Sequence, residues 1–282
     1  MVLKIRMTVL LLSTLALGQA SKPPESSAPS VAPAGQAAAN VPADQENAGK
    51  AKRLLEQAIQ ALGGRAYLDG QDMTQQGRTY SFHHGQPNSA GILFWRFYKF
   101  PDKERVELTK QRDVAYVINA DKGYEITYKG TTSQDPKVLA DSLRRRAHSL
   151  EWVLRKWLND PSVAFFYDGP AVAAEKPAEQ VTIMRQDDSV TLYLDAGTHL
   201  PLKKSFSWRD PMDKLRNTED EVYDNYRPVS GIQTPFSITR FLNGDMSNQR
   251  FLNSVSFNTG LSDSLFEASI TYEPGRPSGK KK

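Results

Sequence analysis

The feature that most constrains the fold is a long succession of short runs rich in aromatic and β-branched residues, separated by turn residues. The first four are ILFWRFYKF (92–100), RVELTK (105–110), AYVIN (115–119) and YEITYKG (124–130). Such runs are typical of β-strands, and the FPDK and NADKG segments between them favour turns. In the first run Leu93, Trp95 and Phe97 occupy alternate positions. One apolar face per strand predicts an antiparallel sheet with another layer packed on that face.

Similar runs resume after residue 178. They are EQVTIMRQ (179–186), SVTLYLD (189–195), LPLKKSFSW (200–208), NTEDEVYDNYR (217–227), QTPFSITRFL (233–242) and SNQRFLNSVSFN (247–258). About a dozen largely consecutive strands favour one large antiparallel sheet, which curves rather than staying flat. The predicted fold class is therefore mainly β with helices (α+β), with one or two helices on the concave face of the sheet.

Two segments have helical periodicity. In residues 47–64 the apolar positions recur at helical spacing up to Gly63 and Gly64, which predict the end of a helix. Residues 135–160 predict one long helix, with Asp135 as N-cap and Pro136 in its first turn. Its apolar stripe, expected to cover the sheet, is Leu139, Leu143, Ala147, Leu150, Leu154 and Trp157. The opposite side carries Arg144, Arg145, Arg155 and Lys156.

The segment DNYRPVSGIQTPFSIT (224–239) combines charged residues with two prolines and a glycine. This pattern is compatible with a strained reactive loop or with a turn between strands. We interpret it as a hairpin tip, with Pro228 and Gly231 in the turn and Gly231 at positive φ. Pro235 then lies where the next strand begins, a position that tolerates proline.

The N-terminus has the pattern of a secretory signal peptide. Lys4 and Arg6 precede the apolar run 7–17, and small residues favour cleavage after Ala20. Residues 21–47 are rich in Pro, Ala and Ser and predict a disordered linker. We expect one folded domain over residues 48–275 and a basic tail over 276–282.

The chain has no cysteine, so no disulfide stabilises it and no lipid-bearing cysteine follows the leader. We therefore expect a soluble periplasmic protein that does not span the membrane. Its net charge is +4, but five of its 36 basic residues lie in the leader and the last three positions. The remaining 31 nearly balance the 32 acidic residues, which argues against a nucleic-acid partner.

The sequence contains no catalytic or cofactor-binding motif that we recognise. Without cysteine there is no thiol chemistry, and the four histidines lack a ligand spacing, so we expect no metal, no cofactor and no enzyme activity. Glu219, Asp220 and Glu221 are interpreted as a solvated strand face, although a carboxylate pair of a hydrolase stays open. Arg144 and Arg145 are either a solvated helix face or a contact for anionic lipid head groups.

The apolar side chains of the sheet and the long helix suggest an incompletely filled trough, in which a hydrophobic molecule could bind. The alternative is that they simply form the core. The candidate lining residues are Trp95, Phe97, Tyr116, Tyr124, Tyr128, Leu143, Leu150, Trp157, Phe206, Trp208, Phe236 and Phe257.

The order of several motifs resembles the LolA-like outer-membrane lipoprotein-sorting proteins. Trp95, Pro101, Arg105 and the turn before Tyr124 match the early strands, and VTLYLDAGTHLPLKKSFSW, VYDNYRPVSGIQTPFSI and VSFNTGLSDSLFEAS match the later ones. The resemblance implies an unclosed β-barrel with helices as a lid over an apolar cavity. The best-known members have an arginine directly before the proline that is Pro101 here, whereas this chain has Phe100.

The resemblance and the trough together suggest a carrier or chaperone for a lipid or the acyl chain of a lipoprotein, working with inner- or outer-membrane sorting proteins. The alternative is a binding module without transport, either a sensor of lipoproteins or a scaffold for a partner protein. A hydrolase of the envelope is a more distant hypothesis.

Overall fold

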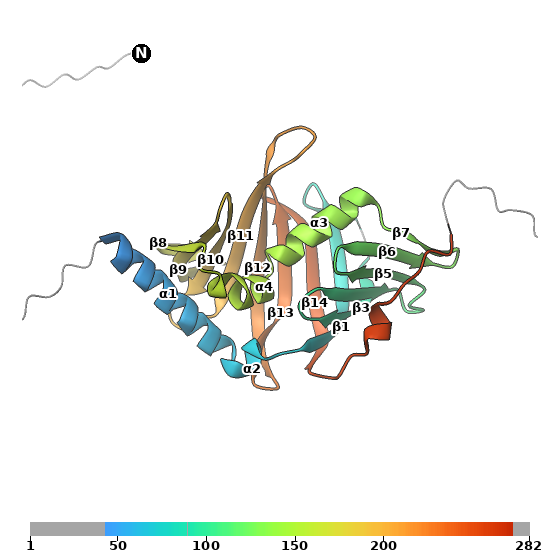
Figure 1. Ribbon diagram of the computed structural model, residues 1–282, viewed down its shortest axis with the longest axis horizontal. Helices are drawn as coiled ribbons and strands as arrows, with labels where there is room; N and C mark the ends of the chain where they lie inside the picture. The colour runs from blue at the N-terminus through green and yellow to red at the C-terminus, as the bar shows by residue number, and fades with distance from the viewer. Residues whose placement is uncertain (1–42, 89, 273–282) are drawn as a thin grey trace, which may run out of the picture. The chain divides into compact units, whose positions relative to one another are not determined.

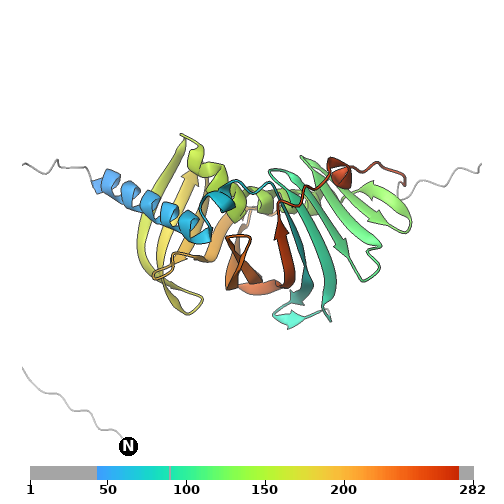
Figure 2. The same cartoon turned by 90° about the horizontal axis from the view of Figure 1, so that it is seen from below.

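A computed structural model describes residues 43–88 and 90–272, which form one large antiparallel sheet with its longer helices on one face (Figures 1 and 2). The strands are β1 (Asp72–His83), β2 (Gln86–Pro87), β3 (Ile92–Lys99), β4 (Lys103–Leu108), β5 (Val114–Asn119), β6 (Lys122–Thr127), β7 (Gly130–Ser133), β8 (Val163–Ala173), β9 (Lys176–Arg185), β10 (Asp188–Asp195), β11 (Pro201–Arg209), β12 (Arg216–Val229), β13 (Ile232–Leu242) and β14 (Asp245–Phe257). The helical segments are α1 (Ala43–Leu62), α2 (Arg65–Leu68), α3 (Pro136–Ala147), α4 (Leu150–Arg155) and the 3-10 turns η1 (Trp157–Asn159) and η2 (Asp263–Phe266).

The strand order explains how the sheet is assembled. It runs β7-β6-β5-β4-β3-β1-β14-β13-β12-β11-β10-β9-β8, with β2 pairing only with β1. Pairing of β1 with β14 joins the early strands to the late ones, and every other step along the order joins strands that are near neighbours in sequence. In the described residues β7 and β8 are the two edges and do not pair, so the sheet is not closed. The predicted mainly β class with an unclosed antiparallel sheet is confirmed.

Both sheet edges have a polar partner. The Asn47 side chain donates to the Tyr167 carbonyl and accepts from its N–H, both at 2.8 Å, and so mimics a neighbouring strand beside β8. At the other edge the backbone N–H groups of Thr271 and Tyr272 donate to the Thr131 carbonyl at 2.9 and 3.1 Å. Exposed strand edges favour aggregation, and these contacts partly cover them.

Helix α1 begins at Ala43, four residues before the expected start at Asn47, and it ends as predicted at Gly63 and Gly64. It packs mainly on β8 and β9 through one apolar face. At its end, Gly63 has a φ of 126°, and a Cβ there would lie 2.4 Å from the Gly231 carbonyl oxygen. Only glycine allows the helix to reach the β12–β13 hairpin this closely. That hairpin turns at Ser230 and Gly231, with φ values of 50° and 79°, as the sequence predicted for Gly231. The expectations for the two prolines are wrong, because Pro228 lies within β12 and Pro235 is the fourth residue of β13 rather than its start.

The prediction of one continuous helix over residues 135–160 is wrong, because the structure has α3, α4 and η1 instead. Asp135 does cap α3, accepting from the N–H groups of Lys137 and Val138. The break falls at Ser149, whose extended backbone and side-chain oxygen, accepting from Trp152 N–H, begin a new helix. His148 spans the break by bonding to the Arg144 carbonyl and to Asp188, each at 2.7 Å.

The apolar core is divided. The larger cluster packs α1, α4 and η1 on strands β8 to β13 and includes Leu55, Leu154 and Trp157, each at most 1% exposed. A smaller cluster joins β1, β3, β13 and β14 around Phe94 and Leu252. Helix α3 has no fully buried residue and lies over the sheet in the region where the cavities described below are found (Figure 1).

Candidate functional site: a cavity between the sheet and helices α3 and α4

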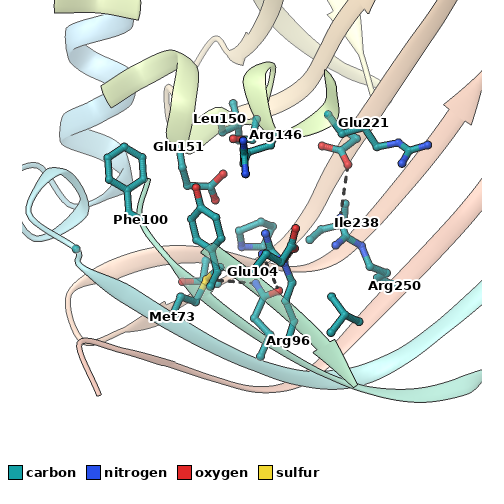
Figure 3. Close-up of a pocket in the computed structure, with 18 of the residues that line it drawn as sticks. Met73, Arg96, Phe100, Glu104, Arg146, Leu150, Glu151, Glu221, Ile238 and Arg250 are labelled. Carbon is teal, nitrogen blue, oxygen red and sulfur yellow. Dashed lines mark hydrogen bonds and ion pairs between the residues drawn. The ribbon is translucent and has the colours of Figure 1, made fainter. Parts of the chain in front are cut away.

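A cavity of about 500 Å³, called here the main cavity, lies between the sheet and the α3–α4 segment. The size falls in the usual range for small-molecule sites, roughly 300–1,000 Å³. Figure 3 shows that apolar and charged side chains share its surface. Its apolar lining is Leu62, Met73, Phe100, Val106, Ile118, Val138, Leu150, Ile232, Ile238 and Phe257.

The charged part of the sheet surface centres on Glu221. Its carboxylate accepts from Lys204 and Arg240 at 2.9 Å and from the Tyr223 hydroxyl at 3.0 Å, and Arg250 lies at 3.5 Å. Burial alone would raise the pKa of Glu221, but the three cations hold that pKa well below its usual range. The side chain is therefore an ionised carboxylate held inside the protein.

Glu219 extends this arrangement along the same strand. It accepts from Arg145 of α3 at 3.1 Å and lies 3.2 Å from Arg240. We call the group formed by Glu219, Glu221, Lys204, Arg145, Arg240 and Arg250 the Glu221 cluster. Because Arg145 belongs to α3, the cluster also fastens that helix to the sheet.

Two further features of the main cavity are polar. Arg96 of β3 donates to Glu104 of β4 and also lies 3.3 Å from the Gln75 amide oxygen. Glu151 of α4 lines the cavity without an ion pair among the described residues. Burial, followed by the charge of Glu151, raises the pKa of Tyr98.

A second cavity of about 610 Å³ adjoins the main one. Both are lined by Tyr116, Arg145, Arg240 and Arg250, so the Glu221 cluster lies where they meet. The second cavity is more polar.

The sequence-predicted lining residues divide into several groups. Tyr116, Leu150 and Phe257 line the main cavity, and Trp208 lines the second cavity together with Tyr116. Leu143 is half-buried on α3 and lines neither.

Three more of these residues belong to the core rather than to a cavity surface. Trp157 and Phe206 are buried in the larger cluster, where Phe206 stacks on His148 with ring centroids 4.2 Å apart. Phe236 is buried in the smaller cluster. These three residues therefore form part of the apolar core and do not line a ligand cavity, which was the alternative interpretation of the sequence.

The remaining candidates lie elsewhere on the sheet. Arg96 and Tyr98 of β3 face the main cavity, so the alternating Trp95 and Phe97 point to the opposite face. Tyr124 is half-buried outside both cavities, and Tyr128 is 88% exposed in the turn after β6.

The expectations for charged residues also need correction. The interpretation of Glu219 and Glu221 as solvent-facing is wrong, since they are 3% and 8% exposed; only the alternating Asp220 turns outward, to Lys203 at 2.9 Å. Arg144 bonds to Asp141 at 2.7 Å, and Arg145 pairs with Glu219. Neither arginine is part of a fully solvated face.

Sequence reasoning missed the half-buried charges that line the main cavity, Arg96, Glu104, Arg240 and Arg250 above all. A signal was available, because Arg96 stands between aromatic residues and Arg240 alternates with Ile238 on an otherwise apolar face. Within the described residues, no group of three side chains could hold a metal ion. The helices in the same part of the chain are too short or too polar to cross a lipid bilayer.

Comparison with solved structures identifies the fold. A protein of family DUF1329 from Desulfovibrio piger superposes with a TM-score of 0.55 at 12% identity, covering 77% of this chain and 97% of that one. An outer membrane lipoprotein-sorting protein domain from Vibrio parahaemolyticus superposes with a TM-score of 0.51 at 13% identity and the same coverages. The fold is LolA-like. No protein-family model and no curated protein sequence matches the chain.

The likeness to these solved structures concerns the fold and not the chemistry of the cavity. The two solved structures are matched over 97% of their length and 77% of this chain, so the resemblance is not limited to one motif. At 12% and 13% identity this likeness concerns the backbone arrangement, and the chemistry of the site follows from the residues of this chain.

Proposed function

We propose that this protein is a carrier or chaperone of the cell envelope that binds a lipid, or the acyl chain of a lipoprotein, in the main cavity. The observation that carries the proposal is the roughly 500 Å³ cavity beneath α3 and α4, with apolar side chains contributed by the sheet and both helices. The LolA-like fold supports it, since one solved neighbour is described as a lipoprotein-sorting domain.

The binding energy would come chiefly from burying hydrocarbon. Each methylene group removed from water contributes about 0.8 kcal/mol, so a chain of several methylenes binds without a specific polar contact. The apolar side chains available for this contact include Leu62, Phe100, Ile118, Val138 and Ile232. In this proposal the acyl chain lies along the sheet beneath α4, and the protein releases it unchanged, as a binding protein and not an enzyme.

Placement in the envelope depends on residues 1–20, the predicted signal peptide, and on the linker that follows. The signal peptide, residues 21–42 of the linker and the whole predicted basic tail (276–282) lie outside the described residues. The proposed location is the periplasm, where sorting proteins of either membrane would deliver or receive the lipid.

Filling the cavity tests the proposal. Ser142 lines the main cavity from α3, and Ser142→Trp would place an indole inside it. Ala140→Trp is the matched control, because Ala140 is exposed on the same helix. We expect native mass spectrometry of protein purified from the envelope to detect bound lipid in the wild type and in Ala140→Trp, and much less in Ser142→Trp.

A second measurement makes the test independent of the lipid that the cell supplies. Binding of N-phenyl-1-naphthylamine, a neutral apolar fluorophore, should weaken at least tenfold in Ser142→Trp and stay unchanged in Ala140→Trp. Wild-type protein that carries no lipid and binds no fluorophore would refute the carrier and leave the scaffold hypothesis.

A further inference from the structure

The Glu221 cluster has more cations than carboxylates. Its cations are Lys204, Arg145, Arg240 and Arg250, and its carboxylates are Glu219 and Glu221. Unbalanced charge inside a protein is unfavourable, because desolvation is not offset by a partner. The excess here faces open space, since all three arginines line both cavities.

Most other carboxylates of the main cavity have their own donors and do not neutralise this excess. Asp72 accepts from the backbone N–H groups at residues 259–261, and Asp135 caps α3. Glu104 pairs with Arg96, and Glu125 accepts from the hydroxyl of Tyr116. The exception is Glu151 of α4, which has no ion pair among the described residues. Its charge acts on Arg96 and Tyr98 and is not among the main influences on the pKa of Arg250.

The second cavity is similar. Its Asp141 is paired with Arg144 at 2.7 Å and lies 3.7 Å from Lys137. Its Asp210 accepts from the Met212 N–H at 2.8 Å. Neither carboxylate is paired with a cation of the Glu221 cluster.

Arg250 is the least satisfied member. Its one ion pair among the described residues is with Glu221 at 3.5 Å, the longest in the cluster, and its Nε has no hydrogen-bond partner. A guanidinium has five N–H donors, so several remain for a ligand. Burial and the nearby Arg240 lower the pKa of Arg250 to about 10 while Glu221 raises it, consistent with a cation that lacks sufficient negative charge nearby.

We propose that the junction of the two cavities binds the acidic head group of an amphiphile, with Arg250 as the principal ligand and Arg240 and Arg145 beside it. The head group is an oxyanion, either a carboxylate or a phosphate ester, because guanidinium groups bind both through paired hydrogen bonds. The hydrocarbon tail then lies in the apolar part of the main cavity. This inference rests on the proposed function and specifies the class of lipid.

Ligands with one chain length and different head groups test the inference. Dodecanoate, dodecyl phosphate and dodecanol would be titrated, below their micellar concentrations, against N-phenyl-1-naphthylamine bound to the wild-type protein. We expect at least one of the two anions to displace the fluorophore at a concentration at least tenfold lower than dodecanol does. Which anion is preferred distinguishes a fatty acid from a phosphate-bearing lipid.

The variant Arg250→Gln tests whether Arg250 causes the preference for anionic head groups. In this variant the anions and dodecanol should displace the fluorophore at similar concentrations, whatever the absolute affinity for dodecanol. Arg216→Gln, a variant of an exposed arginine of β12, should keep the wild-type preference for anions. Equal displacement by anions and dodecanol in the wild type, or an anion preference that survives in Arg250→Gln, overturns the head-group site and leaves the carrier intact. Failure of all three ligands and of the fluorophore overturns both proposals. If Arg250→Gln does not fold, the comparison of the three ligands on the wild-type protein decides whether the head-group site exists.

Discussion

Replacing Glu221 with glutamine should destabilise the protein strongly, although the two side chains have almost the same shape. Glu221 is the acceptor shared by Lys204, Arg240 and Arg250. Glutamine keeps an acceptor for the Tyr223 hydroxyl but removes the negative charge. Lys204 is 1% exposed, so its ammonium group has no access to water once the carboxylate is gone.

The expected magnitude follows from the cost of leaving a buried charge unpaired, about 3–5 kcal/mol. Glu219 still neutralises Arg240 in part, at 3.2 Å, so the lower end of this range is the expected value. A domain of this size loses roughly 2–4 °C of Tm per kcal/mol, which makes the expected decrease roughly 6–12 °C. Urea and thermal unfolding followed by circular dichroism at pH 7 measure both quantities.

A double-mutant cycle separates this explanation from a simple loss of packing. Lys204→Met removes the cation that Glu221→Gln leaves stranded, so the double variant should be at least 1 kcal/mol more stable than the sum of the single effects predicts. Glu56→Gln, at an exposed position of α1, serves as the control and should change stability by less than about 0.5 kcal/mol. Additive single effects, or a cost below about 1 kcal/mol for Glu221→Gln, would refute the reasoning.

Two further predictions concern contacts made by the backbone. Gly63→Ala should lower the free energy of unfolding by at least about 2 kcal/mol. The new Cβ would lie 2.4 Å from the Gly231 carbonyl oxygen, and a φ of 126° is unfavourable for alanine. Urea unfolding measures this change, and an unchanged midpoint contradicts it. Burial raises the pKa of Asp72, but hydrogen bonds from Leu261 and Thr259 lower it below the usual value of 3.8 overall. A carboxyl group whose pKa is lower in the folded than in the unfolded protein stabilises the fold above the unfolded pKa, and this stabilisation is lost as the pH falls through the folded pKa. The difference in the free energy of unfolding between wild type and Asp72→Asn should therefore be present at pH 5 and shrink towards pH 2. A difference independent of pH contradicts this.

The architecture was predictable because strand periodicity is a local property of the chain. The hairpin at Ser230 and Gly231 and the end of α1 at Gly63 follow from turn and cap residues within a few positions. The break at Ser149 was not predicted, because the apolar stripe continues through it at helical spacing. A serine can cap a helix or lie within one, and the bond that His148 makes to Asp188, 40 positions away, is invisible to local pattern.

The site was harder to predict because its residues do not follow the rule that charge faces water. Both faces of β3 carry aromatic side chains, so periodicity could not decide whether Trp95 or Tyr98 faced the helices. Glu221 and Lys204 are paired across neighbouring strands, and Arg250 joins them from β14. Each of these residues alone resembles a surface residue, and only the register of the sheet reveals that they lie together.

The charged residues of the Glu221 cluster also explain why the main cavity is not filled by protein side chains. Protein interiors are normally filled to high density by their own side chains, and α3 could sink onto the sheet if the surface beneath it were apolar. Arg145 instead forms an ion pair with Glu219 on the sheet, and α3 lies over a layer of charged side chains with none of its own residues fully buried. Collapse of the helix onto this layer would separate or further desolvate ion pairs, each at a cost of several kcal/mol. The Glu221 cluster therefore supports the cavity as well as its proposed head-group site, and Glu221→Gln should weaken fluorophore binding along with stability.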